Sequence, residues 1–531
     1  MSPNLQENMA TPFDKHATNQ VNGTTMTTAA RSHDLARLQS HGSHANEAPI
    51  QPYISYIEVP DEVYDRLSPS KKVVIVSLLS FSSFLAPLSS TTILSAVPEV
   101  AATYNTTGSI INLSNALYLI FMGISPCIWG PLSQVYGRRW ICIITATLFL
   151  CCSLGTALAP NLVAYFIFRI LTALEGTAFL SVGASCIGDI YRPTERATAM
   201  GWFYLGTLVG PALGPFIGGV IVTFKPWRVI FYLQTALAGV AAVGAYFLLP
   251  ETAYYKKSSD LVGLSLQTKV TVLWGMVNPW RVVQLYRYPN LIMVALASSS
   301  LVWNMYSLLT PIRYVLNPRF DLTTPIQSGL FYLAPGGGYI LGTFFGGRYA
   351  DYITIKWKAK RGGVRVPEDR LRSALPFMGI VTPACMLIYG WSIEARFGGI
   401  ALPVIMMFCQ GVAQLFCFPS LNTYCLDVMQ AQAAEVVAGN YMVRYMFAAL
   451  ASATVLPAVE GIGVGWVSTI TAAFLVVSSA ATWAAILWGR SWREGIDRRR
   501  RAKRGNKLRR AENGKGVTAS IEEKGKEKQT V

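Results

Sequence analysis

The sequence predicts an all-α polytopic membrane protein with twelve transmembrane helices arranged as two six-helix pseudo-repeats. Of the 531 residues, 52% are hydrophobic and only 14% are charged, whereas soluble proteins are usually about 25% charged. Apolar stretches long enough to cross a bilayer recur too often for the core of a soluble protein. The segments "GPLSQ" (130–134) and "GRYAD" (347–351) each place Gly four residues before Gln or Asp, about 217 residues apart, which indicates a repeat.

The chain divides into five parts by composition. The expected parts are a disordered cytoplasmic tail at 1–70, a first six-helix half at 71–252, a cytoplasmic loop at 253–288, a second six-helix half at 289–489 and a basic cytoplasmic tail at 490–531. The expected spans are 73–95, 109–131, 139–159, 162–184, 198–222, 228–249, 290–312, 326–348, 373–392, 398–420, 434–456 and 464–488.

Basic residues in the loops predict the orientation of the spans. The loop after the second span holds Arg138 and Arg139, and the loop after the fourth holds Arg192 and Arg196. The segment "RYADYITIKWKAKRGGVRVPEDRLR" is interpreted as another strongly basic loop, after the eighth span. Because Lys and Arg are enriched in cytoplasmic loops, both termini are expected in the cytoplasm. The sequon at Asn105 then falls in an outer loop, where it can be glycosylated.

Several classes of function find no support in the sequence. The basic run "RRRRAKRGNKLRR" (498–510) has the composition of a nucleic-acid-binding segment, but it directly follows an apolar span and is expected to be a cytoplasmic tail. The nine Cys show no metal or disulfide spacing, and the sequence contains no phosphate-binding loop. We therefore expect no cofactor, no bound metal, no nucleic-acid partner and no enzymatic activity.

The segment "GTLVGPALGPFIGG" (206–219) places helix-disfavouring residues inside an apolar span. Its glycines recur every four residues and share one helix face, which lets a second membrane helix approach closely. Its prolines bend the helix and free backbone carbonyls, which a helical bundle tolerates. The residues concerned are Gly206, Gly210, Gly214 and Gly218 on the face, with Pro211 and Pro215 between them.

Four segments occur in an order that resembles a known transporter family. "GPLSQVYGRRW", "FRILTALEGTAFLSVG", "GTLVGPALGPFIGG" and "LPETAYY" are similar to signatures of the major facilitator superfamily, and more closely to those of fungal twelve-span drug:proton antiporters. The resemblance extends over about residues 72–490. It implies alternating access of two halves. In the family, the glycine-rich fifth span is associated with antiport and helps to seal the two halves.

The resemblance also implies gating and packing roles at the ends of the second and eighth spans. Gly130 permits close helix approach, and Arg138 and Arg139 reach helix ends or anionic headgroups. Gln134 stands where the family usually has Asp, which weakens a charge relay in the first half. Asp351 keeps an acidic residue at the equivalent place in the second half.

Charged and polar residues inside spans are the candidates for the substrate and proton pathway. Arg169 and Glu175 lie in the fourth span about 120° apart around the helix, so they are not expected to pair. Asn440 and Arg444 share one face of the eleventh span. The two arginines favour a polar or anionic ligand, while a structural ion pair at Arg169 and carbonyl contacts at Arg444 are the alternatives. Since all four His lie in the N-terminal tail, Glu175 is the expected proton carrier.

The resulting hypothesis is a proton-coupled efflux transporter for a small organic molecule. A drug, a fungal secondary metabolite or toxin, and an organic acid all fit as the substrate. The protein is expected to work as a monomer in the cell membrane, with the vacuolar membrane as a second location. A facilitative uniporter or a symporter of an organic anion is the alternative mode of transport, and a non-transporting receptor is the alternative from another class.

Overall fold

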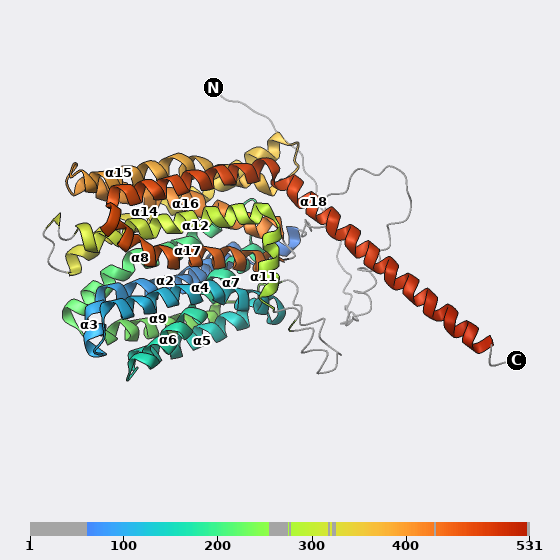
Figure 1. Cartoon of the computed structure of the whole chain (residues 1–531), viewed down its shortest axis with the longest axis horizontal. Coiled ribbons are helices and arrows are strands. Elements are labelled where there is room, and N and C mark those ends of the chain that lie inside the picture. The colour runs from blue at the N-terminus through green and yellow to red at the C-terminus, as the bar shows by residue number, and fades with distance from the viewer. Residues whose placement is uncertain are drawn as a thin grey trace, which may run out of the picture. The chain divides into compact units, whose positions relative to one another are not determined.

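The computed structural model describes residues 61–253, 274, 278–316, 319–320, 325–429 and 432–527, by backbone alone beyond residue 498. Nearly all of these residues are helical, and the long helices lie side by side in one bundle (Figure 1). The expected tail at 1–70 and the expected loop at 253–288 lie largely outside the described residues.

The first half of the bundle begins and ends its helices at residues suited to those positions. The side chain of Asn161 accepts a hydrogen bond from the backbone N–H of Ala164 and so caps a helix start. Gly137, with a φ of 100°, separates two helices. After a short turn at Asp61–Arg66, the helices are α2 (Pro69–Thr92), continued by the turn Ile93–Ala96 and α3 (Val97–Thr103), then α4 (Gly108–Tyr136), α5 (Arg138–Ala157), α6 (Leu162–Gly176), α7 (Ala178–Ile190), α8 (Arg196–Phe224) and α9 (Arg228–Leu248).

The second half follows the same plan with more irregular turns. A π-helical turn at Phe377–Val381 starts the ninth span, and Gly463, with a φ of 85°, separates the last two helices. The elements are α11 (Trp280–Gln284), the turn Leu285–Arg287, α12 (Pro289–Pro311), the turn Ile312–Leu316, α14 (Pro325–Lys360), the turn Pro367–Ser373, α15 (Thr382–Glu394), α16 (Ala401–Val428), α17 (Ala433–Ile462) and α18 (Val464–Glu527).

Within the described residues, 11 helical segments are long and apolar enough to cross a membrane. The segment Leu162–Ile190 joins α6 and α7 into one span, as expected for the fourth. The expected eighth span at 326–348 lies in α14, a helix of 36 residues that is not among these 11 segments. Its sequence "APGGGYILGTFFGG" contains Gly and Pro in place of bulkier apolar residues, which lowers its mean hydropathy.

The structure corrects the expected start of the basic loop after the eighth span. Helix α14 does not stop near residue 348 but continues to Lys360. The residues 349–360 are good or neutral helix formers without Gly or Pro. The first break comes at Gly362 and Gly363, whose φ angles of 65° and 91° a helix cannot contain.

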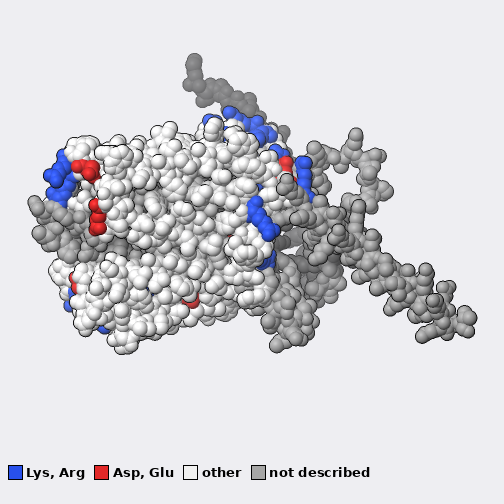
Figure 2. All heavy atoms as spheres, viewed as in Figure 1, with Lys and Arg blue, Asp and Glu red and all other residues white. Residues whose placement is uncertain are grey.

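The surface of the bundle matches a protein surrounded by lipid. In Figure 2, Lys and Arg gather toward the two ends of the bundle, and the band between the ends is mostly uncharged. Large apolar side chains such as Ile167, within α6, and Val240, within α9, are 51% and 61% exposed. The chain is therefore a multi-pass membrane protein, because hydrocarbon is the solvent that such a belt requires.

Two helix pairs form the main contacts between the halves. Helix α8 of the first half packs against α14 of the second, and α4 packs against α17. Helix α8 also packs on α2 within its own half, so it lies between α2 and α14. We call the end of the bundle at which α4 and α14 finish and α8 and α17 begin the latch end.

Candidate transport pathway and gate

The glycine face of α8 packs on α2. A Cβ atom at Gly210 would lie 3.0 Å from the backbone nitrogen of Leu88. Cβ atoms at the other three glycines would collide with residues 80, 91 and 92 of the same helix. Helix α8 continues through both prolines, and the carbonyl of Pro215 accepts a hydrogen bond from Ser95 Oγ at 2.8 Å. The glycine face thus holds the first half together, while another side of α8 meets the second half.

Helix α14 carries two glycine faces of its own, which the sequence analysis missed. A Cβ atom at Gly347 would lie 2.7 Å from the Cα of Thr198 on α8. A Cβ atom at Gly342 would lie 2.8 Å from the carbonyl oxygen of Val412 on α16. Glycines spaced four residues apart at 338, 342 and 346 gave the same signal as those of the fifth span. Helix α14 therefore packs closely against a helix of each half.

Asp351 caps the first turn of α8 from the opposite half of the protein. Its Oδ1 accepts a hydrogen bond from the backbone N–H of Ala197 at 3.1 Å, and its Oδ2 accepts from the N–H of Thr198 at 2.8 Å. The hydroxyl of Thr198 donates a third bond at 2.7 Å. Glu195, at the cap position of α8 itself, makes no side-chain cap bond. A negative charge placed here also interacts favourably with the helix dipole.

Asp427 is the centre of an ionic cluster next to this cap. The carboxylate is fully buried in α16 and contacts Arg196, the first residue of α8, together with Arg365 at 2.5 Å and Arg370 at 3.3 Å. Arg370 also reaches Asp351 at 3.4 Å. Burial lowers the pKa of Arg370, while the nearby carboxylates oppose that shift. The cluster joins the two halves, and breaking it would leave buried charges without partners.

The second contact between the halves at the latch end contains fewer charged groups than the Asp427 cluster. Gln134 Nε2 on α4 donates a hydrogen bond to Glu435 Oε2 on α17 at 2.8 Å. Arg281 lies 3.8 Å from the other oxygen of Glu435. A Cβ atom at Gly130 would lie 3.3 Å from the carbonyl oxygen of Ala434. The neutral Gln134 therefore still connects the halves, through its amide rather than through a charge.

The arginine pair after α4 secures the first half internally. Arg138 is 6% exposed and its Nε lies 3.2 Å from Asp189 Oδ2, while its backbone N–H donates to Glu251 Oε1 at 2.8 Å. Glu251 of the "LPETAYY" segment thus binds the first residue of α5. Arg139 donates to the carbonyl of Tyr246, near the end of α9, at 2.8 Å. Arg139 thus contacts the end of α9, while Arg138 is buried.

Arg169 is fully buried inside the first half. Its Nη1 donates to the carbonyl and the hydroxyl of Ser89 at 3.0 and 3.1 Å, and its Nη2 lies 3.5 Å from Asn115 Oδ1. The guanidinium lies 4.3 Å from the centre of the Tyr118 ring. Among the described residues, no carboxylate lies within 4 Å of it, and its Nε has no hydrogen-bond partner. It does not pair with Glu175.

Arg444 occupies a similar environment in the second half. Its Nη2 donates to Asn422 Oδ1 at 2.8 Å, and Asn440 Nδ2 donates to the same oxygen at 2.8 Å. The guanidinium lies 4.6 Å from the centre of the Tyr441 ring. The Tyr441 hydroxyl in turn lies 2.8 Å from that of Tyr204 on α8, which links the two halves. Over the described part of the chain, this arginine also has no carboxylate partner.

Glu175 lies apart from both arginines. Its side chain is half-buried near the end of α6, and its Oε2 is buried without a hydrogen-bond partner. The carboxylates of Asp189, Asp427 and Glu435, by contrast, each bind an arginine or an amide. Of these four carboxylates, Glu175 is therefore the one whose charge the protein leaves least compensated.

Asn105 lies in the short connection between α3 and α4. It is exposed and has a φ of 49°, a conformation that Asn adopts more readily than most residues. The position is accessible to a glycosylating enzyme if this loop faces the outside.

The sequence of the chain matches a known family. A family model described as Major Facilitator Superfamily matches residues 79–453. The chain belongs to the Major Facilitator Superfamily. As a member, it is a transporter and not an enzyme.

Relatives of this superfamily member include fungal antiporters and exporters. MFS antiporter QDR3 of Candida albicans is 24% identical, over 79% of this chain and 78% of the relative. Efflux pump radE of Floropilus chiversii is 26% identical, over 78% and 79%. Citrate exporter 1 of Aspergillus niger is 25% identical, over 84% and 90%. The expectation of an efflux-type transporter of this superfamily is confirmed, without its substrate.

Solved structures support the fold of this superfamily member. The proton:xylose symporter XylE bound to 6-bromo-6-deoxy-D-glucose aligns with a TM-score of 0.59 at 13% identity, over 79% of this chain and 97% of that one. The human organic anion transporter MFSD10 aligns with a TM-score of 0.57 at 13% identity, over 78% and 100%. The predicted all-α fold of two six-helix halves is confirmed.

Proposed function

We propose that this transporter exports a small organic anion in exchange for protons, by alternating access of its two halves. The observation that carries the proposal is the pair of buried arginines, Arg169 and Arg444, one in each half. Each lies against aromatic rings and amide or hydroxyl oxygens, without a carboxylate within 4 Å among the described residues. A buried cation without a counter-ion favours binding of an anion.

The aromatic rings around the arginines add a preference for a flat organic compound. Tyr118 stacks on one guanidinium, and Tyr441 and Phe418 lie within 4.6 and 4.9 Å of the other. Their ring faces offer apolar contact beside the charge. An aromatic acid or a tricarboxylate fits these surroundings better than a neutral drug, and one of the relatives is named citrate exporter 1.

We assign proton coupling to Glu175. An ionised carboxylate inside a membrane is costly unless it is paired or hydrated. Because Glu175 lacks such a partner at Oε2, protonation removes this cost and deprotonation restores it. Asp427 and Glu435 are less suited, since each is already held by arginine or amide contacts at the latch end.

The contacts at the latch end act as the gate in this proposal. With both termini in the cytoplasm, as the Lys and Arg distribution predicts, the latch end is the cytoplasmic end. Access from the cytoplasm then requires the Asp351 cap and the Asp427 cluster to break. The same proposal keeps the parts at 71–252 and 289–489 as the moving halves of a monomer, in the cell or vacuolar membrane.

Efflux from proteoliposomes tests the proposal. Purified protein is reconstituted, citrate and an aromatic carboxylate are offered as separate probes, and a pH gradient is imposed with and without a protonophore. We expect gradient-dependent transport of at least one anion, and loss of its transport in Arg169→Ala and Arg444→Ala. Transport that ignores the gradient would instead identify a facilitative uniporter, and equal transport of a neutral aromatic dye would exclude anion selectivity.

A further inference from the structure

A groove of about 1090 Å³ runs along α8, between α2 and α14. This volume is slightly above the range of about 300–1,000 Å³ seen for small-molecule pockets. Its lining is mostly apolar and includes Phe81, Phe84, Leu205, Val209 and Ile340. Its floor is α8, which packs closely against α2 through its glycine face and against α14 at Gly347. The groove therefore has one wall from each half of the protein.

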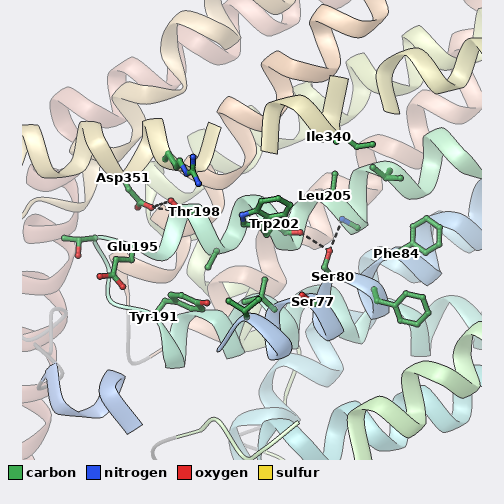
Figure 3. Close-up of a pocket in the computed structure, with 18 of the residues that line it drawn as sticks. Ser77, Ser80, Phe84, Tyr191, Glu195, Thr198, Trp202, Leu205, Ile340 and Asp351 are labelled. Atoms are coloured by element: carbon green, nitrogen blue, oxygen red, sulfur yellow. Dashed lines mark hydrogen bonds between the residues drawn. The ribbon is translucent and has the colours of Figure 1, made fainter. Parts of the chain in front are cut away.

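The two ends of the groove differ in polarity. Figure 3 shows Tyr191, Glu195 and Asp351 at one end, and Phe84 and Ile340 at the other. Asp351 is already used by the α8 cap, but Arg348, one helical turn before it, lines the same groove. Arg348 is exposed and forms no ion pair within the described part of the chain. Lys72 adds a second positive charge, 5.4 Å from the centre of the Tyr191 ring.

The length of the groove corresponds to one leaflet of a bilayer. On α2 the lining runs from Val73 to Phe84, which is about 17 Å of helix at 1.5 Å per residue. The hydrocarbon core of a bilayer is about 30 Å thick, so each leaflet contributes about half of that. The charged end, at the latch end of the bundle, then lies at the depth of the lipid headgroups.

We propose that this groove is a binding site for one phospholipid, with an acyl chain along α8 and the phosphate at Arg348. Lys72 supplies a second cation for an anionic headgroup, and Glu195 faces the same end with the opposite charge. Because α2 belongs to one half and α14 to the other, the bound lipid bridges the two halves when the latch end is closed. The inference does not depend on which substrate is transported.

Two variants of the full chain test the site from opposite ends. Ser77 is exposed and lines the groove, so Ser77→Trp fills it without disturbing a buried residue. Val74→Trp is the matched control, because Val74 is 43% exposed on the same helix and does not line the groove. Arg348→Gln removes the phosphate contact, and Lys358→Gln removes an exposed charge of the same helix outside the groove.

The measurement is native mass spectrometry of the purified protein titrated with phosphatidylserine, together with thermal unfolding in the same lipid. We expect one tightly retained lipid in the wild type and in both controls, and none in Ser77→Trp. Arg348→Gln should bind about fivefold more weakly, as expected for one basic residue beside an anionic headgroup. The lipid should raise the midpoint of unfolding of the wild type but not of Ser77→Trp.

Retention of the same lipid by Ser77→Trp would place the lipid elsewhere and overturn the proposal. Unchanged affinity of Arg348→Gln, or equal retention of a sterol in place of phosphatidylserine, would overturn the assignment of the phosphate to this end. Failure of transport in proteoliposomes with a normal lipid titration would contradict the proposed function alone, so the two proposals can fail separately.

Discussion

Replacing Asp351 by Ala removes the cap that the second half places on α8. The three hydrogen bonds of the cap are lost, two from backbone N–H groups and one from the hydroxyl of Thr198, and so is the 3.4 Å contact with Arg370. At about 1 kcal/mol net for each cap bond, the arrangement with a closed latch end loses about 3 kcal/mol of stability. This shifts the equilibrium about 150-fold toward the arrangement with an open latch end. Asp351→Asn keeps one acceptor oxygen and should cost about half as much, because a single carbonyl oxygen can replace only part of the carboxylate.

Distance measurements between the halves provide the assay. Spin labels at positions 192 and 358, in a variant whose nine Cys are replaced, report the separation of the first half from α14. We expect one short, narrow distance in the wild type, an added longer distance in Asp351→Asn, and mostly the longer distance in Asp351→Ala. The double variant Asp351→Ala/Thr198→Ala should resemble the single variant, since the hydroxyl no longer has its partner.

An unchanged distance distribution in Asp351→Ala would refute this reasoning. It would mean that the Asp427 cluster alone holds the latch, because that cluster contacts the same helix through Arg196. A change that is equally large in Thr198→Ala alone would also contradict the estimate, because that variant keeps both backbone bonds.

Four further predictions follow from packing and charge. Gly206→Ala should impair transport more than Gly210→Ala, because the new methyl group would collide with the carbonyl of Ser80, whereas at Gly210 it would lie 3.0 Å from the backbone nitrogen of Leu88. Overpacking costs about 1–3 kcal/mol, and thermal unfolding of both variants measures this loss of stability. Glu175→Gln should bind the substrate yet lose the dependence of efflux on the pH gradient, as measured in proteoliposomes; a retained dependence would move the proton carrier elsewhere. Arg444→Lys should weaken substrate binding, because Lys lacks the planar guanidinium that stacks on the Tyr441 ring. The loss of binding free energy should be at least as large as the loss of folding stability. Substrate binding equal to that of the wild type would argue for a structural role. Asn105→Gln should abolish a glycosidase-sensitive shift in electrophoretic mobility, and no shift in the wild type would argue against an outer loop there.

Apolar length and glycine spacing were sufficient to predict the helices. The twelve expected spans all fall on helical segments because hydrocarbon leaves the backbone no alternative to helix. The predicted end of α14 was wrong because a basic composition was interpreted as a loop. A helix can extend beyond the membrane when nothing in its sequence breaks it, and the break here is Gly362. Charge predicts the position of a membrane surface better than it predicts the end of a helix.

Some residues of the candidate site were recognised in the sequence, but their contacts were not. Gln134 and Asp351 were recognised from equivalent segments of the two halves, whereas their partners, Glu435 and the start of α8, lie far away in sequence. Asp427 had no motif of its own, and its importance comes from three arginines that only folding brings together. The glycine face of α8 was visible in the sequence, but the helix that it contacts was not.

The latch end is built from two unequal contacts, and this inequality sets an order of events. The bond from the Gln134 amide to Glu435 Oε2 involves one charged group, and Arg281 lies 3.8 Å from the other oxygen of Glu435. On the other side, three guanidinium groups and a helix terminus share two buried carboxylates, and separating them requires rehydration of several charges at once. The contact between α4 and α17 should therefore open first. The contact between α8 and α14 should stay closed, and the halves should rotate about it, until ions or solvent reach it. Raising the salt concentration would then speed the second step of the opening more than the first.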